Sequence, residues 1–386
     1  FLAAIALSAL ASNLVMVVLS NYLKSVYHIT AVQRGFIEFP RELPGVLTVF
    51  VVVLLAGYSN ITIAIIAQLL SVFGAVVLGF YRPEYNIMLL FIFINSMGQH
   101  LLMPAVDSLA ISQSKDGEVG KKMGRVKGVQ TAFAMLAGVI VFFGFKTNLF
   151  RFDRPFVGVF IAAAFAGLMA LTVYVKMHKK LHASIIDEKK LRFVYRREYK
   201  YYYGLVILYG LQKQIMLVFS PWVIISYFNK GPDTIAILTI IGSFIGMFFI
   251  PKIGVWVDRF GIKKLLFFDA WSFVVVYLAF GVAISSIEAN LFSSSLIPLF
   301  MIYTIFILDK MSNQMGLVRT LYLKSISFSP AEVTSTLSFG LALDHVISIS
   351  AAIAAGFIWA HLGAQYIFFI LASVSLINVY IAHKVS

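Results

Sequence analysis

The chain has 386 residues, of which 60% are hydrophobic and 12% are charged, and it carries a formal net charge of +14. Water-soluble domains contain about 25% charged residues, so this composition excludes a soluble globular protein and predicts an all-α protein that crosses a membrane many times. A transmembrane β-barrel is excluded too, because the apolar runs are continuous and do not alternate with polar residues. The chain has no cysteine, which excludes disulfides, thiol catalysis and thiolate metal sites.

Apolar windows of about 20 residues, the length that a helix needs to cross a bilayer, follow one another along the chain. The first window is too long for the apolar core of a signal peptide, and because it starts without Met we expect a trimmed N-terminus. Twelve membrane-spanning helices are predicted, over residues 1–23, 34–57, 61–81, 86–112, 127–146, 155–176, 201–227, 233–253, 264–285, 291–318, 332–358 and 364–383.

The second span carries charges on one helical face. Its sequence R-G-F-I-E-F-P-R-E-L-P-G places Arg34, Glu38, Arg41, Glu42 and Gly45 at helical spacing. Two prolines within it remove backbone donors and bend the helix, which leaves carbonyl groups that a wet cavity can satisfy. We expect Glu38 or Glu42 to bind a proton or substrate, because burial raises and Arg41 lowers the pKa of such a carboxyl. The alternative is a Glu–Arg network that only stabilises packing.

The fourth span contains the polar residues Asn95, Gln99, His100 and Asp107. A histidine can titrate near neutral pH, as proton coupling requires, although His100 could equally be a hydrogen-bonded group between helices. Asp107 lies near the inner end of the span, where a gating network is the more natural role.

The only long polar connection, residues 177–200, divides the chain into two halves of six helices, residues 1–176 and 201–386. Basic residues concentrate in this segment and in other loops of the same side. Because cytoplasmic loops are enriched in lysine and arginine, we expect both termini and the 177–200 linker in the cytoplasm, and the protein in a bacterial inner membrane. The clustering in loops argues against a nucleic-acid partner. Only six basic residues lie in the predicted outer loops: Lys24, Arg82, Lys146, Arg151, Arg154 and Lys230.

The seventh span carries Lys213 near its middle, and residues 201–203 at its start are three tyrosines, typical of an interfacial belt. A lysine in mid-membrane needs a counter-ion. Candidates are Asp344 in the eleventh span and Asp309 in the tenth. The alternative is a permanent salt bridge that only ties two helices together.

Between the eighth and ninth spans, residues 254–264 read G-V-W-V-D-R-F-G-I-K-K. This charged, glycine-bounded turn resembles the loop signature G-x-x-x-D-R-x-G-x-K/R-K/R of the major facilitator superfamily of transporters. The resemblance implies that Asp258 and Arg259 act as a conformational latch. The corresponding loop of the first half, residues 57–61, reads G-Y-S-N-I and lacks the charged residues, so any latch there is weaker or built differently.

The resemblance also implies two six-helix halves with the substrate between them, near mid-membrane. In that family spans one, four, seven and ten line the cavity, which would put His100 and Lys213 close to the solute. Asp269, about two turns into the ninth span, would belong to a cytoplasmic gating network.

Charges within the predicted spans comprise six acids and three bases. This excess of carboxylate favours proton coupling, or a cationic or zwitterionic solute, over a simple anion. The acids are Glu38, Glu42, Asp107, Asp269, Asp309 and Asp344, and the bases are Arg41, Lys213 and Lys310.

Motifs for other functions are absent from the sequence. It has no H-E-x-x-H, G-x-S-x-G or G-x-x-x-x-G-K-[ST] motif, and no cluster of His and Asp at metal-ligand spacing, so an enzyme, an ATP-driven pump, a metal site and a bound cofactor are not expected. We predict a monomeric, proton-coupled secondary transporter that moves a small organic solute by alternating access. An ATP-independent lipid flippase of the same fold stays open.

Overall fold

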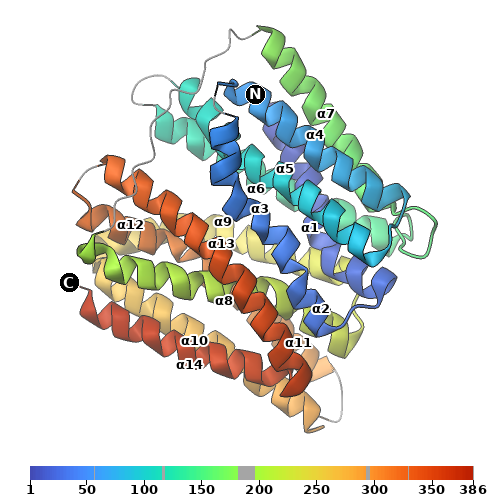
Figure 1. The fold of residues 1–386 in the computed structure, drawn as a ribbon. Coiled ribbons are helices and arrows are strands. Elements are labelled where there is room, and N and C mark those ends of the chain that lie inside the picture. The colour runs from blue at the N-terminus through green and yellow to red at the C-terminus, as the bar shows by residue number, and fades with distance from the viewer. Residues whose placement is uncertain (56, 115–117, 181–195, 293–295, 329, 386) are drawn as a thin grey trace. The chain divides into compact units, whose positions relative to one another are not determined.

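The structure, a computed structural model, describes residues 1–55, 57–114, 118–180, 196–292, 296–328 and 330–385, and every regular element in these ranges is a helix (Figure 1). The elements are α1 (Leu2–Tyr27), α2 (Ala31–Phe36), α3 (Glu38–Leu54), α4 (Asn60–Phe80), α5 (Tyr85–Ser112), α6 (Val119–Lys146), α7 (Gly158–Lys180), η1 (Arg197–Tyr199), α8 (Lys200–Phe228), α9 (Pro232–Phe260), α10 (Ile262–Glu288), α11 (Leu296–Gln314), α12 (Gly316–Ile326), α13 (Pro330–His361) and α14 (Ala364–Lys384).

Eleven helical segments of the described chain are long and apolar enough to cross a membrane. They correspond to eleven of the twelve predicted spans. The remaining predicted span is the charged second one, which the structure forms from α2 and α3. The all-α, many-span architecture is therefore confirmed. Part of the predicted linker, residues 181–195, lies outside the described residues.

The second span was expected over residues 34–57 with a bend at its prolines; the structure begins it at Ala31 and divides it into two helices. The helix is interrupted at Ile37, between α2 and α3. Pro40 accounts for the break, because proline has no N–H to donate to the carbonyl of Phe36, four residues earlier, and its ring clashes with that carbonyl. Pro44 is accommodated inside α3.

The tenth span also differs from the prediction. It consists of α11 and α12, separated at Met315 and followed by Gly316, and it continues to Ile326 instead of ending at residue 318. Arg319, which the predicted end of the span at residue 318 leaves in the following loop, therefore lies on a helix, where it is only 5% exposed. Apolar residues at 317, 318, 321 and 323 carry the span past its predicted end.

The turn between α9 and α10 is a single residue. Gly261 has φ +82° and ψ 158°, a conformation that a residue with a side chain rarely adopts. The predicted tight turn is confirmed at this glycine. Gly254, expected to begin the turn, instead lies inside α9 with open space around its Cα.

Contacts between described residues group the chain into two units, called unit 1 and unit 2 below. Residues 30–38 group with unit 2 and residues 231–240 with unit 1, so the units differ from the two predicted six-helix halves, which stay a prediction. Unit 1 comprises the described residues of Phe1–Ile29, Phe39–Lys189 and Gly231–Ile240, and unit 2 those of Thr30–Glu38, Lys190–Lys230 and Ile241–Ser386.

In unit 1, glycines let α4 and α5 approach closely. A Cβ on Gly98 would lie 2.5 Å from the backbone nitrogen of Ser71, and one on Gly74 would lie 2.6 Å from Asn95 Cβ. The close approach allows Asn95 Nδ2 to donate a hydrogen bond to the backbone oxygen of Ser71 over 2.6 Å. Packing and polar contact between these two helices therefore depend on the same glycines.

In unit 2, α2 and α13 pack through glycines in the same way. A Cβ on Gly35 would overlap the carbonyl oxygen of Ala352, and one on Gly356 would lie 2.8 Å from that of Ala31. Two helix backbones in direct contact leave no room for side chains, as is common where membrane helices associate.

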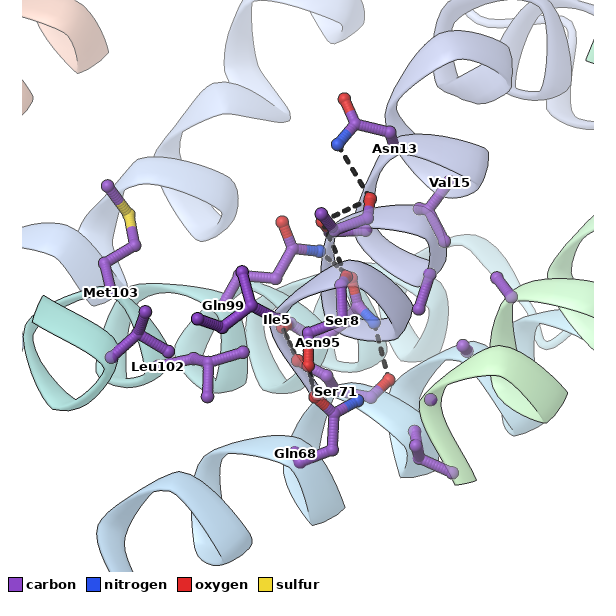
Figure 2. Close-up of a pocket in the computed structure, with 18 of the residues that line it drawn as sticks. Ile5, Ser8, Asn13, Val15, Gln68, Ser71, Asn95, Gln99, Leu102 and Met103 are labelled. Carbon is purple, nitrogen blue, oxygen red and sulfur yellow. Dashed lines mark hydrogen bonds between the residues drawn. The ribbon is translucent and has the colours of Figure 1, made fainter. Parts of the chain in front are cut away.

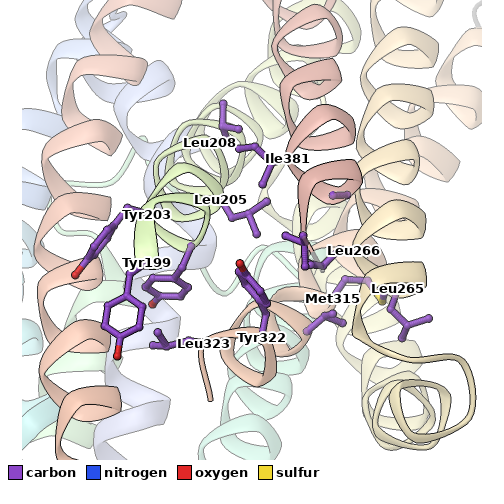
Figure 3. Packing of buried hydrophobic residues seen from close by; sticks show 14 of the residues in the cluster. Tyr199, Tyr203, Leu205, Leu208, Leu265, Leu266, Met315, Tyr322, Leu323 and Ile381 are labelled. Atoms are coloured by element: carbon purple, nitrogen blue, oxygen red, sulfur yellow. The ribbon is translucent and has the colours of Figure 1, made fainter. Parts of the chain in front are cut away.

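The core of unit 2 at the start of α8 is a cluster of aromatic and aliphatic side chains from α8, α10, α12 and α14 (Figure 3). Tyr202 and Tyr203 belong to this cluster and are buried, so their assignment to an interfacial belt is wrong. Leu205, Leu266 and Leu323 surround them in the same cluster.

Arg196, the first described residue after the gap at 181–195, is tied to the start of α13. Arg196 donates to both carboxylate oxygens of Glu332, over 2.6 and 3.1 Å, and Tyr199 Oη donates to Glu332 Oε2 over 2.6 Å. The Arg196 guanidinium, and secondly the Tyr199 hydroxyl, hold the pKa of the Glu332 carboxyl below its ordinary value. These hydrogen bonds hold the C-terminal end of the linker against α13.

Glu332→Gln should lower the melting temperature at neutral pH and have little effect in acid. A carboxyl with a depressed pKa stabilises the folded chain above its unfolded pKa, about 4.3 for glutamate, and loses that contribution as the pH falls through the lower, folded pKa. Thermal unfolding of purified parent and variant between pH 3.5 and 7.5 measures this. Exposed Glu84→Gln is the control; a constant difference at every pH would contradict the expectation.

Candidate functional site

Glu38 is completely buried and accepts hydrogen bonds from two side chains of unit 2. Arg34 Nη1 lies 2.6 Å from Glu38 Oε1, and Gln214 Nε2 donates to Glu38 Oε2 over 2.5 Å. Arg34 lies in α2 and Glu38 begins α3, so the break at Ile37 falls between them. The two side chains nevertheless pair, as expected for residues four apart on one helical face. Each oxygen of this carboxylate therefore has a donor, and one donor is a cation.

Arg41 and Glu42 form the second pair of the predicted charged face. Their closest side-chain atoms, Arg41 Nη2 and Glu42 Oε1, are 2.7 Å apart, and both residues belong to unit 1. The backbone oxygen of Arg41 accepts a hydrogen bond from Ser96, which also lies 3.1 Å from His100 Nδ1. The charged face of the second span is thus divided into two adjacent ion pairs, each with a local arginine.

Lys213 is paired with Asp344, one of its two predicted counter-ions. Gly210, one helical turn earlier on α8, makes this possible, because a Cβ there would lie 2.7 Å from Asp344 Oδ1. The Lys213 side chain is 30% exposed and that of Asp344 is 9% exposed, so the pair borders a more accessible region at the lysine. His345, next in the chain, is buried.

Asp269 on α10 is paired with Arg319 on α12. Both side chains are at most 7% exposed, and the ring of Tyr209 lies 3.9 Å from the Arg319 guanidinium carbon. Gly316 leaves space for this arginine, since a Cβ there would lie 3.1 Å from Arg319 Nη2. We expected Asp269 in a gating network but missed Arg319 by ending the tenth span too early.

Asp309 on α11 is the buried acid of unit 2 that forms no ion pair within 4 Å among the described residues; the cation that acts on it is its chain neighbour Lys310. It is 1% exposed, and its Oδ1 atom makes no hydrogen bond there. Lys310 is too far from the Asp309 carboxylate for an ion pair: its Nζ lies 5.0 Å from the Phe306 ring centre, and its stem packs where Gly242 of α9 leaves room. Asp309 is not the counter-ion of Lys213.

The residues predicted for gating are more accessible. Asp107 lies 3.7 Å from Lys127, and both side chains are more than 40% exposed. Asp258 and Arg259 are exposed at the end of α9, where the Arg259 guanidinium lies 5.2 Å from the ring centre of Phe260. No ion pair joins Asp258 to Arg259 in the described chain.

Arg34 and Arg319 change the count of charges in the spans. Both are buried in helices, which raises the bases from three to five against six acids. The excess of carboxylate that favoured a cationic or zwitterionic solute is therefore reduced to a single charge.

Unit 1 contains a cavity of about 190 Å³ among α1, α4, α5, α6 and α7 (Figure 2). Asn95 and Gln99 were recognised in the sequence, but the other polar residues were not, because single serines and amides in apolar windows give no periodic signal. The polar lining residues are Ser8, Ser12, Asn13, Gln68, Ser71, Asn95, Gln99 and Gln130.

Comparison with known protein families gives one match that covers most of the chain. The sequence profile of the Major Facilitator Superfamily matches residues 1–308. A comparison with curated proteins gave no match.

Solved structures share the fold over nearly the entire chain. The nucleoside transporter NupG matches 99% of this chain and 97% of its own, with 11% identity and a TM-score of 0.75. A POT family transporter in complex with 5-aminolevulinic acid matches 100% and 96%, with 11% identity and a TM-score of 0.76. A D-xylose-proton symporter matches 100% and 96%, with 13% identity and a TM-score of 0.71.

Proposed function

Because the chain belongs to the Major Facilitator Superfamily, we propose that it is a secondary active transporter that moves a small organic solute by alternating access, driven by protons. The observation that supports proton coupling is the buried carboxylate of Asp309 in a membrane-spanning helix, which forms no ion pair within 4 Å and leaves Oδ1 without a hydrogen bond in the described chain. An ionisable residue buried in a membrane span costs free energy, so its presence usually indicates a function. Protonation would remove the cost of an isolated buried charge, and deprotonation would restore it.

Coupling requires that the proton-binding group meets different surroundings in the two states of the transporter. Glu38 and Glu42 each have an arginine within 2.7 Å, so their charges are compensated locally. The Lys213–Asp344 pair, accessible at the lysine, is the second candidate for a solute or proton site. Asp309 is our first candidate because no arginine or lysine forms an ion pair with it within 4 Å among the described residues.

The function is tested in two steps. Thermal unfolding of the purified chain against a panel of metabolites, drugs and lipids identifies a solute, which is then offered to proteoliposomes with an imposed pH gradient. We expect the solute to accumulate against its concentration gradient, and a protonophore to abolish this. Transport that ignores the pH gradient would overturn proton coupling, and stabilisation by lipids alone would favour a flippase.

We further propose that the protein is a monomer in a bacterial inner membrane, with both termini and the linker in the cytoplasm. His178→Cys at the end of α7 should then be protected from an impermeant maleimide added to intact cells, whereas Lys146→Cys should be labelled. Both positions are exposed, and the parent has no cysteine to contribute background. Labelling of residue 178 but not 146 would reverse the orientation, which rests on the distribution of lysine and arginine.

Asp258→Asn should change the rate of transport and not the recognition of the solute. Asp258 is exposed at the end of α9, next to the one-residue turn, so it can act on the balance between inward-open and outward-open states. We expect the equilibrium affinity to stay within about tenfold of the parent, or 1.4 kcal/mol. Loss of binding without a change in the accessibility of engineered cysteines would contradict this role.

A further inference from the structure

The cavity of unit 1 is lined by uncharged side chains (Figure 2). None of its lining residues is an acid or a base, whereas eight carry an amide or a hydroxyl group. The buried ion pairs described above involve none of these residues. A molecule in this cavity therefore meets both donors and acceptors of hydrogen bonds but no charged side chain.

Hydrogen bonds within the lining hold the amides in place and leave several of their polar atoms available. Ser8 Oγ donates to Gln68 Oε1 over 2.7 Å, so the Gln68 amide nitrogen keeps its hydrogens free of any partner in the described chain. Gln99 Nε2 donates to Asn95 Oδ1 over 2.7 Å, which leaves Gln99 Oε1 available as an acceptor. Gln130 on α6 has no hydrogen bond to a described residue.

These groups are prepositioned. Gln68 is 1% exposed. A Cβ on Gly167 of α7 would lie only 2.9 Å from Gln68 Nε2, so the absence of a side chain at Gly167 leaves room for this amide. Gln68 is thus a deeply buried polar side chain with unused donors that border the cavity. Such donors are normally satisfied by water or by a ligand.

The remaining lining is apolar. Ile5, Val15, Val72, Leu102 and Val106 line the cavity together with the amides. A volume of about 190 Å³ is several times the roughly 30 Å³ that one water molecule occupies in the liquid. Small-ligand sites commonly combine apolar contact surface with a few fixed polar groups.

We propose that this cavity binds the uncharged, hydroxyl- or amide-bearing part of the transported solute, such as a sugar ring, a polyol or a nucleoside. The inference rests on the proposed transport function and specifies its substrate class. Neutral amides discriminate by supplying donors and acceptors to matching groups, whereas a bare carboxylate or ammonium in this cavity would lack a counter-charge.

The test measures thermal unfolding and equilibrium binding of the purified full chain with two sets of probes. D-glucose, D-xylose, myo-inositol and uridine are the uncharged set, and L-lysine, L-glutamate and succinate are the charged set. We expect at least one uncharged probe to raise the melting temperature in a saturable manner, and the charged probes to have no effect.

Variants locate the site. Gln99→Leu should weaken binding of the stabilising probe at least tenfold, and Gln130→Leu should do so without loss of folded protein, because Gln130 has no hydrogen bond in the described chain to lose. Gln113→Leu, the same replacement at the C-terminal end of α5 and outside the cavity, is the matched control and should bind like the parent.

Three results would overturn the inference. If only charged probes bind and are transported, the substrate class is wrong while the transport function stands. If an uncharged probe binds equally well to the parent, Gln99→Leu and Gln130→Leu, the class is right but the site is elsewhere. If no probe of either set binds and no panel solute is transported, the proposed function fails together with the inference.

Discussion

Replacement of Asp309 by asparagine is expected to abolish proton-driven accumulation of solute while exchange of labelled for unlabelled solute continues. Asparagine has nearly the shape of protonated aspartate but cannot release a proton, so the site would be fixed in its neutral form. With one proton per solute, a gradient of one pH unit supports about tenfold accumulation, equivalent to 1.4 kcal/mol. We expect this ratio to fall to unity in the variant, measured in proteoliposomes with an imposed pH gradient.

Asp153→Asn provides the matched control, because this exposed carboxylate is paired only with Arg151 in a loop and its loss should leave accumulation unchanged. Glu38→Gln and Glu42→Gln belong in the same experiment, since the sequence favoured them as coupling residues. If accumulation survives in Asp309→Asn but is lost in either glutamate variant, the coupling proton is on the second span, and the Asp309 proposal is wrong.

Replacement of Arg319 by methionine is expected to destabilise the protein strongly. It would leave Asp269 buried without its cation, and removal of one member of a buried pair costs about 3–5 kcal/mol. Asp269 and Arg319 are the least exposed pair after Arg34–Glu38, and Arg319 also loses its contact with Tyr209. Chemical unfolding of the purified protein in detergent measures the change.

The double variant Asp269→Leu/Arg319→Met should recover most of this stability, because apolar residues of similar size commonly replace a buried pair without net cost. Exposed Arg125→Met controls for the substitution itself, with an expected change within about 0.5 kcal/mol. If the double variant is as unstable as the single one, the pair contributes packing that methionine and leucine cannot supply. If the stable double variant also transports, the pair is structural.

Most of the fold could be predicted from the sequence because membrane spans are long and nearly uniformly apolar. Eleven segments of this kind are recognisable without any partner in view. The two errors fall at Ile37 and Met315, where a helix is interrupted inside an apolar or charged window. Pro40 marks the first interruption, but Gly316 alone gives no comparable signal, since single glycines are frequent in membrane helices.

The site was less predictable, because charge pairing depends on which helices lie side by side. Lys213 clearly needed a counter-ion, yet the choice between Asp344 and Asp309 required the close approach at Gly210. Arg34 and Glu38 are four residues apart, so their pairing could be anticipated from helical spacing. Nothing local to Arg319 indicated burial, because its partner is 50 residues away in the chain.

The interruption at Met315 places the charges of the tenth span on two separate helices: Asp309 on α11 and Arg319 on α12. Arg319 fastens α12 to α10 through Asp269, whereas no ion pair within the described chain fastens α11, which carries Asp309. In an unbroken helix, a tilt of one end moves the other end too. At a hinge, a few backbone dihedral angles change instead. Gain or loss of a proton at Asp309 therefore changes the charge on α11, the part of the span that this ion pair does not hold.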